Sequence, residues 1–487
     1  MDLLDYFTKV DTNILSVDTN ILSVDTNILS VDTNILSVDT NILSAKELEF
    51  TTDELADISE DILETIDEYM ENEIKNMSSP TFHETMLEDI IEYYVDMWKR
   101  YGICNDQDYD TIEELVQQQI YIYFDIYAIP VRSCFYTDER LSYDKDITWI
   151  HNQIQHLQSI PQPKQKSQEW HDFRYNLITA SNLSKALGSV AQQNSLIYEK
   201  CKPPDANMEK RFNNTESTMH WGVKYEPITL MIYEDTYSTK AADFGCIPHP
   251  NHSFIGASPD GINVDPANES LFGRMIEIKN IFNRDITGIP KEEYWVQCQI
   301  QMETCDLNEC DFIETRFKEF ESEDNFYSDT TSEYKGIILY FVQRTLGYGV
   351  DLSFSVPYNN SPVYIYLPLD IQLDKESIDA WIELQKQQNR EVVLFKTIYW
   401  YLDELSCVLI QRNRRWFQSV LPRIKDTWDI ILKERVSGYE HRAATKKKVA
   451  DLTNKLIVEK TGGSSTHQIH NMPLTNSICL IKLDTLD

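Results

Sequence analysis

Apolar residues recur at helical spacing in three stretches near the start of the chain. Residues 51–75 and 84–100 place them three or four positions apart, with polar residues between them. This spacing puts the apolar side chains on one face of a helix, so both stretches are expected to be amphipathic helices. Residues 111–129 predict a third helix, although the tyrosine-rich end of this stretch also fits a strand. This part of the chain is therefore expected to be mainly helical.

Later in the chain, stretches of helical spacing alternate with stretches in which every second residue is apolar. Helices are expected at residues 147–160, 183–187, 221–233, 294–305, 374–391 and 411–435. Strands are expected at residues 274–279, 312–314, 334–348 and 363–367, and a strand, a turn and a strand at 242–255. The acidic residues 319–329 are expected to form a loop. This mixture predicts an α/β (α+β) protein.

Charged residues are distributed unevenly along the chain. The formal net charge is −35, and residues 46–150 alone contain 27 acidic and 7 basic residues. Residues 411–460 show the opposite balance, with 13 basic and 6 acidic residues. Charged runs on helices usually face solvent, so we favour a solvated helical region for residues 46–150 over a DNA mimic or a partner-binding module. A surface that binds nucleic acid has to be sought locally, because the overall charge says little about it.

Residues 10–44 consist of five identical copies of the heptapeptide VDTNILS. Val, Ile and Leu occupy the first, fifth and sixth positions of the repeat, which does not make a coiled-coil seam. Asp, Thr and Asn are also poor helix formers, so a disordered segment or a loosely formed amphipathic helix is expected. A short solenoid or an interaction tail is left open, because repeats can stack.

Several classes of protein are disfavoured by the sequence. No apolar run reaches the ~20 residues that cross a bilayer, so no membrane partner is expected. The first residues, MDLLDYF, lack the basic start of a secretory signal. The nine cysteines are scattered without a C-x-x-C pair, which argues against a zinc site and favours reduced thiols. These features favour a cytosolic or nuclear protein.

These patterns divide the chain into four expected regions. The repeat segment covers residues 1–45, and the acidic helical region covers residues 46–150. A proline-containing linker at residues 161–166 lies near the start of an α/β domain that is expected to cover residues 151–435. Residues 436–487 are expected to form a basic and then polar tail. Its three consecutive lysines at 446–448 are too few to identify a nucleic-acid-binding or nuclear-import signal.

Two carboxylates and one lysine are expected to meet where a turn precedes a strand. Residues 258–261 read SPDG, which is typical of a turn because Pro fixes φ and Gly accepts positive φ. In the strand at 274–279, Glu277 and Lys279 share one face because side chains alternate. If the turn brings Asp260 beside Glu277, their charges require a cation, and carboxylate oxygens suit Mg²⁺ or Mn²⁺. A lysine beside such an ion can orient or deprotonate a water molecule, which is the outline of phosphodiester hydrolysis.

Neither half of this pattern is specific alone. A second Glu-x-Lys tripeptide, at residues 73–75, lies in a helical pattern and has no partner turn. Short motifs of this kind match by chance in many proteins, and most such matches are structural. The two halves together, in this order and on a predicted strand, make the hydrolytic interpretation much stronger.

Two further groups of polar residues have both a structural and a functional interpretation. His249 and His252 lie three residues apart in a predicted turn, and we favour exposed turn residues over a metal site. In residues 411–435, basic and aromatic residues are interleaved. The apolar face of this predicted helix is expected to be core, and its arginines are candidates for contacts with a DNA backbone.

Four blocks of the sequence resemble, in the same order, those of the YqaJ viral recombinase family, a lambda-exonuclease-like branch of the PD-(D/E)xK nuclease superfamily. The first block reads SQEWHDFR at residues 167–174 and ITAS at 178–181, and the second reads GVKYE at 222–226. The third block is the SPDG turn with EIK at 277–279, and the fourth reads YWVQCQIQM at 294–302. The resemblance therefore covers roughly residues 165–303.

The resemblance implies a restriction-endonuclease-like fold, in which helices flank a mixed central sheet. It also implies that Asp260, Glu277 and the Ile278 carbonyl hold the metal ion. Glu226 is implied to support that ion from an adjacent helix, and Lys279 to position the attacking water. Mg²⁺, or Mn²⁺ in its place, is the expected cofactor.

Glutamines of the fourth block are also implied at the site. The resemblance places Gln297 at the edge of the active site. Helical spacing puts Gln301 on the same face as Gln297, whereas Gln299 points elsewhere.

The first block is implied to bind the 5′ phosphate of a DNA end. Arg174 and Ser181 match the family's phosphate-gripping positions. From the residues alone, Arg174 beside a helix N-terminus also suits a phosphate, and Thr179 or Ser181 can cap that helix. A structural salt bridge for Arg174 and a capping role alone for Ser181 are the alternatives.

Together these residues predict a Mg²⁺-dependent DNA nuclease. Family resemblance implies a 5′-to-3′ exonuclease on double-stranded DNA, which acts in viral DNA recombination or repair in the cytoplasm or nucleus of an infected host cell. A single-strand annealing protein is the implied partner, and a homo-oligomer is left open. The alternative is a non-catalytic component that binds DNA or protein and retains the nuclease fold. The intact Asp260, Glu277 and Lys279 argue against this alternative.

Overall fold

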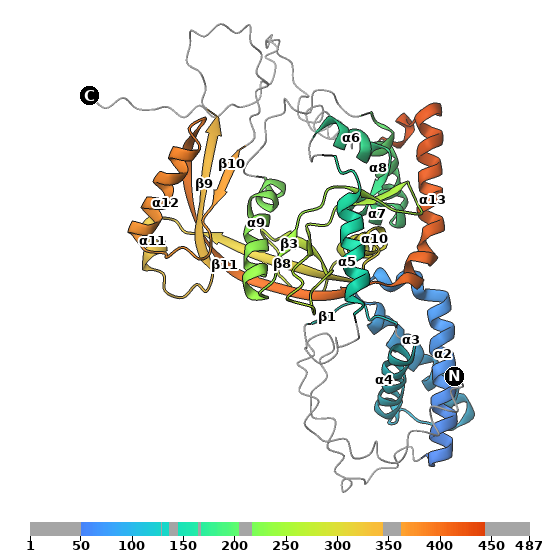
Figure 1. Ribbon diagram of the computed structural model, residues 1–487. Coiled ribbons are helices and arrows are strands. Elements are labelled where there is room, and N and C mark those ends of the chain that lie inside the picture. Colours follow the sequence, from blue (N-terminus) through green and yellow to red (C-terminus); the bar gives the residue numbers. More distant parts are fainter. Residues whose placement is uncertain are drawn as a thin grey trace, which may run out of the picture. The chain divides into compact units, whose positions relative to one another are not determined.

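The computed structural model describes residues 50–127, 129–135, 145–163, 167–203, 217–343 and 362–443 (Figure 1). The chain separates into two compact units, Met1–Arg442 and Ala443–Asp487, and nearly all the described residues belong to the first. The VDTNILS repeats and the three lysines at 446–448 lie outside the described residues, so their assignments stay predictions. The expected regional boundaries at 45, 150 and 435 stay predictions as well.

Three helices at the start of the described chain match the periodic stretches of the sequence. They are α2 (Thr52–Glu73), α3 (Phe82–Tyr101) and α4 (Tyr109–Ile126), and a short 3-10 helix, η2 (Ile74–Ser78), follows α2. Helix α2 begins with a capping box, in which the Thr51 and Glu54 side chains each accept a hydrogen bond from the other residue's backbone N–H. The tyrosine-rich end of the third stretch lies in α4, so the helix was the correct choice there.

The main sheet has the strand order β10-β9-β11-β8-β7-β6-β3, and β1 pairs with β11. Its strands are β1 (Cys134–Phe135), β3 (Ala241–Ala242), β6 (Gly261–Asn263), β7 (Met275–Asn280), β8 (Glu309–Glu319), β9 (Lys335–Gln343), β10 (Val363–Tyr366) and β11 (Val392–Gln411). Strands β7 and β8 run parallel, and the other neighbours are antiparallel. The predicted α/β (α+β) class with a mixed central sheet is therefore confirmed.

Further helices lie between these strands along the chain, and some of them pack against the main sheet (Figure 1). They are α5 (Ile147–Ser159), α6 (Gln168–Tyr175), α7 (Ala180–Leu187), α8 (Val190–Cys201), α9 (Thr218–Thr236), α10 (Glu292–Cys305), α11 (Glu323–Ser328), α12 (Lys375–Gln388) and α13 (Arg414–Ser437). Helix α10 is the crossover from β7 to the parallel strand β8, because two parallel strands cannot be joined by a tight turn.

Strand β7 has one apolar and one charged face. Ile276 and Ile278 pack with α9 in one buried cluster, whereas Met275 packs with α10 in another. Because side chains alternate along a strand, Glu277 and Lys279 lie on the same face as Met275. The predicted division of this strand is therefore confirmed, and its charged face is turned toward α10.

A second, three-stranded sheet has the order β2-β5-β4. Strand β2 (Ile178–Thr179) pairs in parallel with β5 (Ile255–Ala257), and β4 (Ile247–Pro248) pairs with β5 in the antiparallel sense. In this register Thr179 lies opposite Gly256. The small sheet thus brings the ITAS segment of the first sequence block next to the strand that leads into the SPDG turn.

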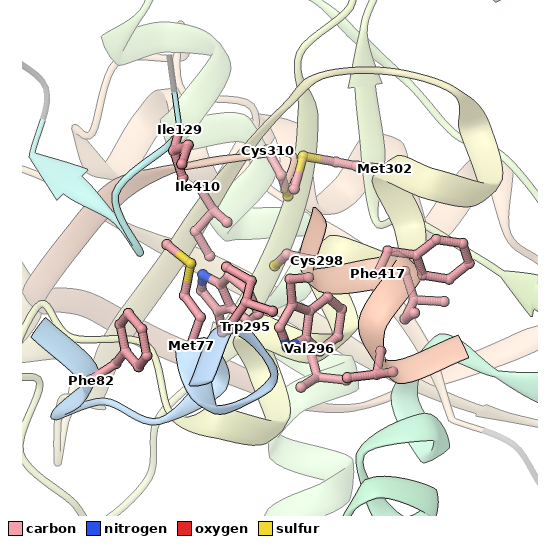
Figure 2. Close-up of a cluster of buried hydrophobic side chains, with 14 of the residues drawn as sticks. Met77, Phe82, Ile129, Trp295, Val296, Cys298, Met302, Cys310, Ile410 and Phe417 are labelled. Atoms are coloured by element: carbon pink, nitrogen blue, oxygen red, sulfur yellow. The ribbon is translucent and has the colours of Figure 1, made fainter. Parts of the chain in front are cut away.

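Figure 2 shows the buried cluster that joins η2 to the α/β part of the chain. Met77 of η2 and Phe82 of α3 lie in the same cluster as Trp295 of α10 and Phe417 of α13. The Asn413 side chain donates to the Met77 sulfur at 2.9 Å. Helix α10, which faces the charged side of β7, is therefore anchored in an extensive apolar core.

Two assignments along the sheet differ from the sequence-based expectation. Residues 319–329 are not entirely a loop, because they contain α11. Its first turn is capped by Ser322, which accepts from the Asn325 N–H at 3.2 Å, and Phe326 is fully buried. The acidic residues there suit a helix N-terminus, which the loop prediction neglected. Strand β11, for which no element was predicted, runs for 20 residues.

Candidate active site

Asp260 lies directly against strand β7. Its backbone N–H donates to the Ile276 carbonyl at 3.1 Å, and its Oδ2 accepts from the Ile278 N–H at 2.7 Å. Burial raises the pKa of Asp260 well above its ordinary range, and the negative charges of Glu277 and Glu226 raise this pKa further. The SPDG turn therefore brings three carboxylates close enough to influence one another.

Glu277 and Lys279 form an ion pair on the charged face of β7. Glu277 is only 1% exposed, and its second oxygen accepts from Gln301 Nε2 at 2.6 Å. Lys279 Nζ donates to Gln297 Oε1 at 3.2 Å and lies 4.9 Å from the ring centroid of Tyr294. Three side chains of α10 therefore hold the two charged groups of β7 in place.

The ammonium group of Lys279 is stabilised by the carboxylates around it. Burial alone would lower the pKa of Lys279, but the charges of Glu277 and Asp260 outweigh burial and raise this pKa above its ordinary value. Lys279 therefore carries a positive charge at neutral pH in the protein without a metal. In that state it can donate a hydrogen bond to a water molecule or to a phosphate oxygen.

Glu226 projects from α9 and is exposed. Asn280, at the end of β7, ties this part of α9 to the strand. Its Nδ2 donates to the Gly222 carbonyl at 3.0 Å, and its Oδ1 accepts from the Thr229 hydroxyl at 2.7 Å. The roles of Glu226 and of the Ile278 carbonyl toward a metal ion stay predictions.

The donors around Asp260 suit a divalent cation. Within the described part of the chain, no group of three or more His, Cys, Asp or Glu side chains is spaced to enclose a metal. Mg²⁺ commonly takes only one or two carboxylates and completes its coordination with water. Asp260 and Glu277 supply two carboxylates, and a cation between them would offset the charges that raise the pKa of Asp260. Mn²⁺ accepts the same oxygen ligands.

Arg174 lies in the last turn of α6 and stacks on Trp170. Its guanidinium carbon is 4.4 Å from the ring centroid. Burial lowers the pKa of Arg174, and the Cys246 thiol and Glu199 oppose this shift. Among the residues that the structure describes, Arg174 forms no ion pair with a carboxylate. The structural salt bridge considered from the sequence is therefore not found within the described part of the chain.

Thr179 and Ser181 lie where β2 leads into α7. Thr179 occupies the N-cap position, but its side chain makes no capping hydrogen bond. Its Oγ1 lies 3.2 Å from Ser181 Oγ and 3.5 Å from the side-chain amide of Asn182. The prediction of a side-chain cap is therefore wrong for Thr179, whose hydroxyl bonds neighbouring side chains instead. Ser181 is exposed in the first turn of α7, and its role toward DNA stays a prediction.

His249 and Arg412 are internal residues. His249 stacks on Phe417 of α13 with 5.6 Å between ring centroids, and burial lowers the pKa of His249 to about 4. The prediction of an exposed turn residue is wrong for His249, because α13 covers this part of the turn. Arg412 is 8% exposed and pairs with Glu303, so it is not available to DNA. The predicted apolar face of α13 is buried, as expected.

The sequence predicted which face of α10 carries the site residues, but it did not predict which side chains they contact. Helical spacing correctly puts Gln301 beside Gln297, and Gln299 faces elsewhere, where its side chain accepts from the Asn413 N–H. The spacing did not reveal that Gln301 contacts Glu277. A residue three positions before Gln297 shares its helix face, and this is the signal that could have identified Tyr294.

The fold around the charged residues at the end of β7 agrees with the restriction-endonuclease-like fold that the resemblance implies. An antiparallel pair, β6 and β7, is followed by the crossover helix α10 and the parallel strand β8. Residues 169–308 match the family model of the YqaJ-like viral recombinase domain, so the resemblance noted in the sequence is confirmed for this part of the chain. All the residues predicted for the metal site and the phosphate site lie within it.

Parts of the chain are similar to known proteins. It is 30% identical over 305 residues to uncharacterized protein R354 of Acanthamoeba polyphaga mimivirus, a match that covers 57% of this chain and 54% of that protein. The match thus spans about half the length of this curated relative. An alkaline exonuclease of Laribacter hongkongensis shares 17% identity over 60% of this chain and 100% of its own, with a TM-score of 0.29. A phage-related exonuclease from Haemophilus somnus 129PT shares 14% identity over 53% and 94%, with a TM-score of 0.26.

No helix within the described ranges is long and apolar enough to cross a membrane.

Proposed function

We propose that this protein is a Mg²⁺-dependent DNA nuclease, and specifically a 5′-to-3′ exonuclease on duplex DNA. The observation that carries the proposal is the convergence of Asp260, Glu277 and Lys279 at the end of β7. A protein that only binds DNA gains nothing from carboxylates gathered at its DNA site, because their charges repel phosphate. The polarity and the duplex substrate are taken from the family resemblance.

Each residue of the candidate site has its own proposed role in the hydrolysis. Asp260 and Glu277, with the Ile278 carbonyl, would hold the Mg²⁺ or Mn²⁺ ion, and Glu226 would support it. A bound ion of this kind lowers the pKa of a coordinated water and stabilises charge that develops on the phosphate. Gln297 and Tyr294 of α10 contact the Lys279 ammonium group, which supports the proposal that it would orient the attacking water.

Arg174 and Ser181 would bind the 5′ phosphate of the DNA end. The planar guanidinium of Arg174 can form two parallel hydrogen bonds to a phosphate. Ser181 is exposed in the first turn of α7, where free backbone N–H groups favour an anion. Binding of the terminal phosphate would fix the end from which the strand is degraded.

The proposed setting is viral DNA recombination or repair in the cytoplasm or nucleus of an infected cell. Degradation of one strand from a 5′ end leaves a single strand that can anneal elsewhere. A single-strand annealing protein is therefore the proposed partner beside double-stranded DNA, and a homo-oligomer is open. The competing hypothesis is a non-catalytic component that keeps the nuclease fold. A cleavage assay distinguishes this hypothesis from a nuclease.

Linear duplex DNA is incubated with the full chain, with Mg²⁺ or with EDTA, and the products are resolved on a denaturing gel. We expect degradation only with Mg²⁺, and no degradation by Lys279→Ala. The matched control is Lys75→Ala, which alters the Glu-x-Lys tripeptide of η2, where the lysine side chain is exposed. If Lys279→Ala cleaves at the wild-type rate, this lysine has no role in the mechanism. If the wild-type chain is inactive, the hypothesis of a non-catalytic component is favoured.

A further inference from the structure

Lys200, in the last turn of α8, is a buried cation that belongs to none of the four sequence blocks. It is 7% exposed, and its Nζ donates to the backbone carbonyl of Arg174 at 2.8 Å. Among the described residues it forms no ion pair, since Glu199 pairs with Lys185 instead. A buried ammonium group without a carboxylate partner is costly, so its surroundings call for an explanation.

Other positive charges surround this ammonium group. Burial lowers the pKa of Lys200 to about 8, and although Glu199 acts against this shift, Arg174 and Arg435 lower the pKa further. Arg435 Nε and Nη2 are already engaged, because they donate to the backbone carbonyls of Lys200 and Tyr175, and the guanidinium stacks on Tyr175 at 3.8 Å. Arg174 and Lys200 are the two cations that act on the Cys246 thiol, where a ligand could reach both.

Two neutral donors in the same place are buried without a partner. Trp170 Nε1 and Ser258 Oγ make no hydrogen bond among the described residues. Trp170 stacks on Arg174, and Ser258 lies beside the Cys246 thiol, which is at most a weak acceptor for the serine hydroxyl and is influenced by both Arg174 and Lys200. Buried donors are satisfied in nearly all proteins, so two of them beside two unpaired cations indicate an absent acceptor.

The small sheet explains why these groups converge. Thr179 pairs with Gly256 in parallel strands, so the chain leaves β2 and β5 in the same direction. Ser181 and Ser258 each follow by two residues. Ile247 pairs with Ala257 in antiparallel strands, which sets Cys246 opposite Ser258. The two serines therefore follow the same end of the small sheet, and Cys246, opposite Ser258, contacts the side chain of Arg174 in the last turn of α6.

We propose that Lys200 is the second cation of this pocket, and that together with Arg174 it selects a terminal phosphate monoester. This inference rests on the proposed DNA-end activity and adds a residue to it. A terminal monoester carries close to two negative charges at neutral pH, whereas an internal diester carries one. Two cations without carboxylate partners match the dianion, and Trp170 and Ser258 supply donors for its remaining oxygens.

A purely structural role for Lys200 is the competing explanation. Its bond to the Arg174 carbonyl could serve only to close the C-terminal end of α6, as cations at helix ends often do. A capping role predicts a loss of thermal stability and an equal change on all DNA ends. The pocket role predicts a change that depends on the terminal phosphate.

The test measures binding of the full chain to fluorescent duplex DNA in EDTA, where cleavage does not interfere, at fixed ionic strength. One duplex has 5′-phosphate ends and the other has 5′-hydroxyl ends. We expect the wild-type chain to bind the phosphorylated duplex roughly tenfold more tightly or better. A duplex with hydroxyl ends lacks the phosphate that accepts charge-assisted hydrogen bonds from the pocket. Lys200→Gln should lose most of this preference while its affinity for hydroxyl ends stays unchanged, and Lys200→Arg should retain most of it.

The matched control is Lys202→Gln, which removes one positive charge from the exposed lysine two residues away. Its preference should equal that of the wild type. An intact preference in Lys200→Gln, or equal losses on both duplexes, would overturn the proposal. If melting curves show that Lys200→Gln is unfolded, Lys200→Met, which keeps the aliphatic stem, replaces it with the same expectations. Cleavage in Mg²⁺ is scored separately, so the nuclease activity can stand even where the role of Lys200 fails.

Discussion

The candidate site has two halves whose unbalanced charges are opposite in sign. In the carboxylate half, Glu277 pairs with Lys279, and burial together with the charges of Glu277 and Glu226 raises the pKa of Asp260. In the cationic half, Arg174 and Lys200 have no carboxylate partner among the described residues. The first half therefore suits a cation and the second an anion, as the proposed function requires. A metal-dependent enzyme that acts at a phosphorylated DNA end requires both, next to each other.

One side chain of α10 connects the two halves. Gln301 Nε2 donates to Glu277 Oε2 at 2.6 Å and to the Ser258 carbonyl at 3.3 Å. Glu277 belongs to the carboxylate half, and Ser258 belongs to the cationic half. In the proposed function, a helix anchored in the buried core of Figure 2 would set the distance between the metal and the terminal phosphate.

The largest effect on cleavage is expected when one charge is removed from the carboxylate half. We expect Glu277→Gln to lower the cleavage rate by about 10³-fold or more, because one carboxylate ligand is lost and Lys279 loses its partner. The measurement is single-turnover cleavage of linear duplex DNA in Mg²⁺. Affinity for 5′-phosphate ends should be retained, and a parallel loss of that affinity would show that the halves are not separate.

Removing the connection should have a smaller effect. Gln301→Leu is expected to lower cleavage roughly 10- to 100-fold, as loss of a group that orients a metal ligand usually does. The matched variant is Gln299→Leu, on the opposite side of α10, where the side chain bonds Gln411 and Asn413. That variant should lower the melting temperature and leave the activity of the folded protein nearly unchanged. Equal effects on cleavage would refute a specific role for Gln301.

The variant Arg174→Ala tests the role of the cationic half. We expect this variant to reduce cleavage of 5′-phosphorylated ends roughly tenfold, because a charge-assisted contact is lost, and to affect 5′-hydroxyl ends much less. Initial rates on the two duplexes give the comparison. Equal losses on both kinds of end would remove Arg174 from the phosphate site.

The smallest expected effect is on stability without a metal. Because the pKa of Asp260 is higher in the folded protein than its ordinary value of 3.8, Asp260 takes up a proton on folding. Its contribution to the free energy of unfolding therefore falls as the pH rises from about 4 through the raised pKa. In EDTA, Asp260→Asn should melt a few degrees above the wild type at pH 8, and this difference should shrink toward pH 5.

Melting curves at both pH values, with and without Mg²⁺, provide the control for this effect. Mg²⁺ should stabilise the wild type more than Asp260→Asn, because binding to the folded state raises its stability. A difference between the two proteins that does not depend on pH would contradict the charge repulsion at Asp260.

The sequence predicted the carboxylate half better than the cationic half, for a physical reason. Glu277 and Lys279 share one face of a strand by local alternation, and the turn that carries Asp260 leads into the neighbouring antiparallel strand β6. Lys200 meets Arg174 only because α8 packs beside the end of α6, and no periodicity along the chain encodes that contact. In the sequence it is an ordinary lysine in the last turn of a helix.

The fold shows the same division between local and distant information. The amphipathic helices α2, α3 and α5 follow directly from the spacing of apolar residues. Strand β11 escaped prediction because it is half-buried along much of its length and pairs with three strands distant in sequence. His249 was expected to be exposed, because its cover, Phe417, comes from α13 near the other end of the chain.

The most direct test of the central claim is calorimetric titration of Mn²⁺ into the wild type, Asp260→Asn, Glu277→Gln and the double variant. If the two carboxylates hold one ion, each single substitution should weaken binding at least tenfold, and the double variant should bind little more weakly than either single one. Unchanged affinity in a single variant, or two losses that simply add, would mean that Asp260 and Glu277 do not share a cation.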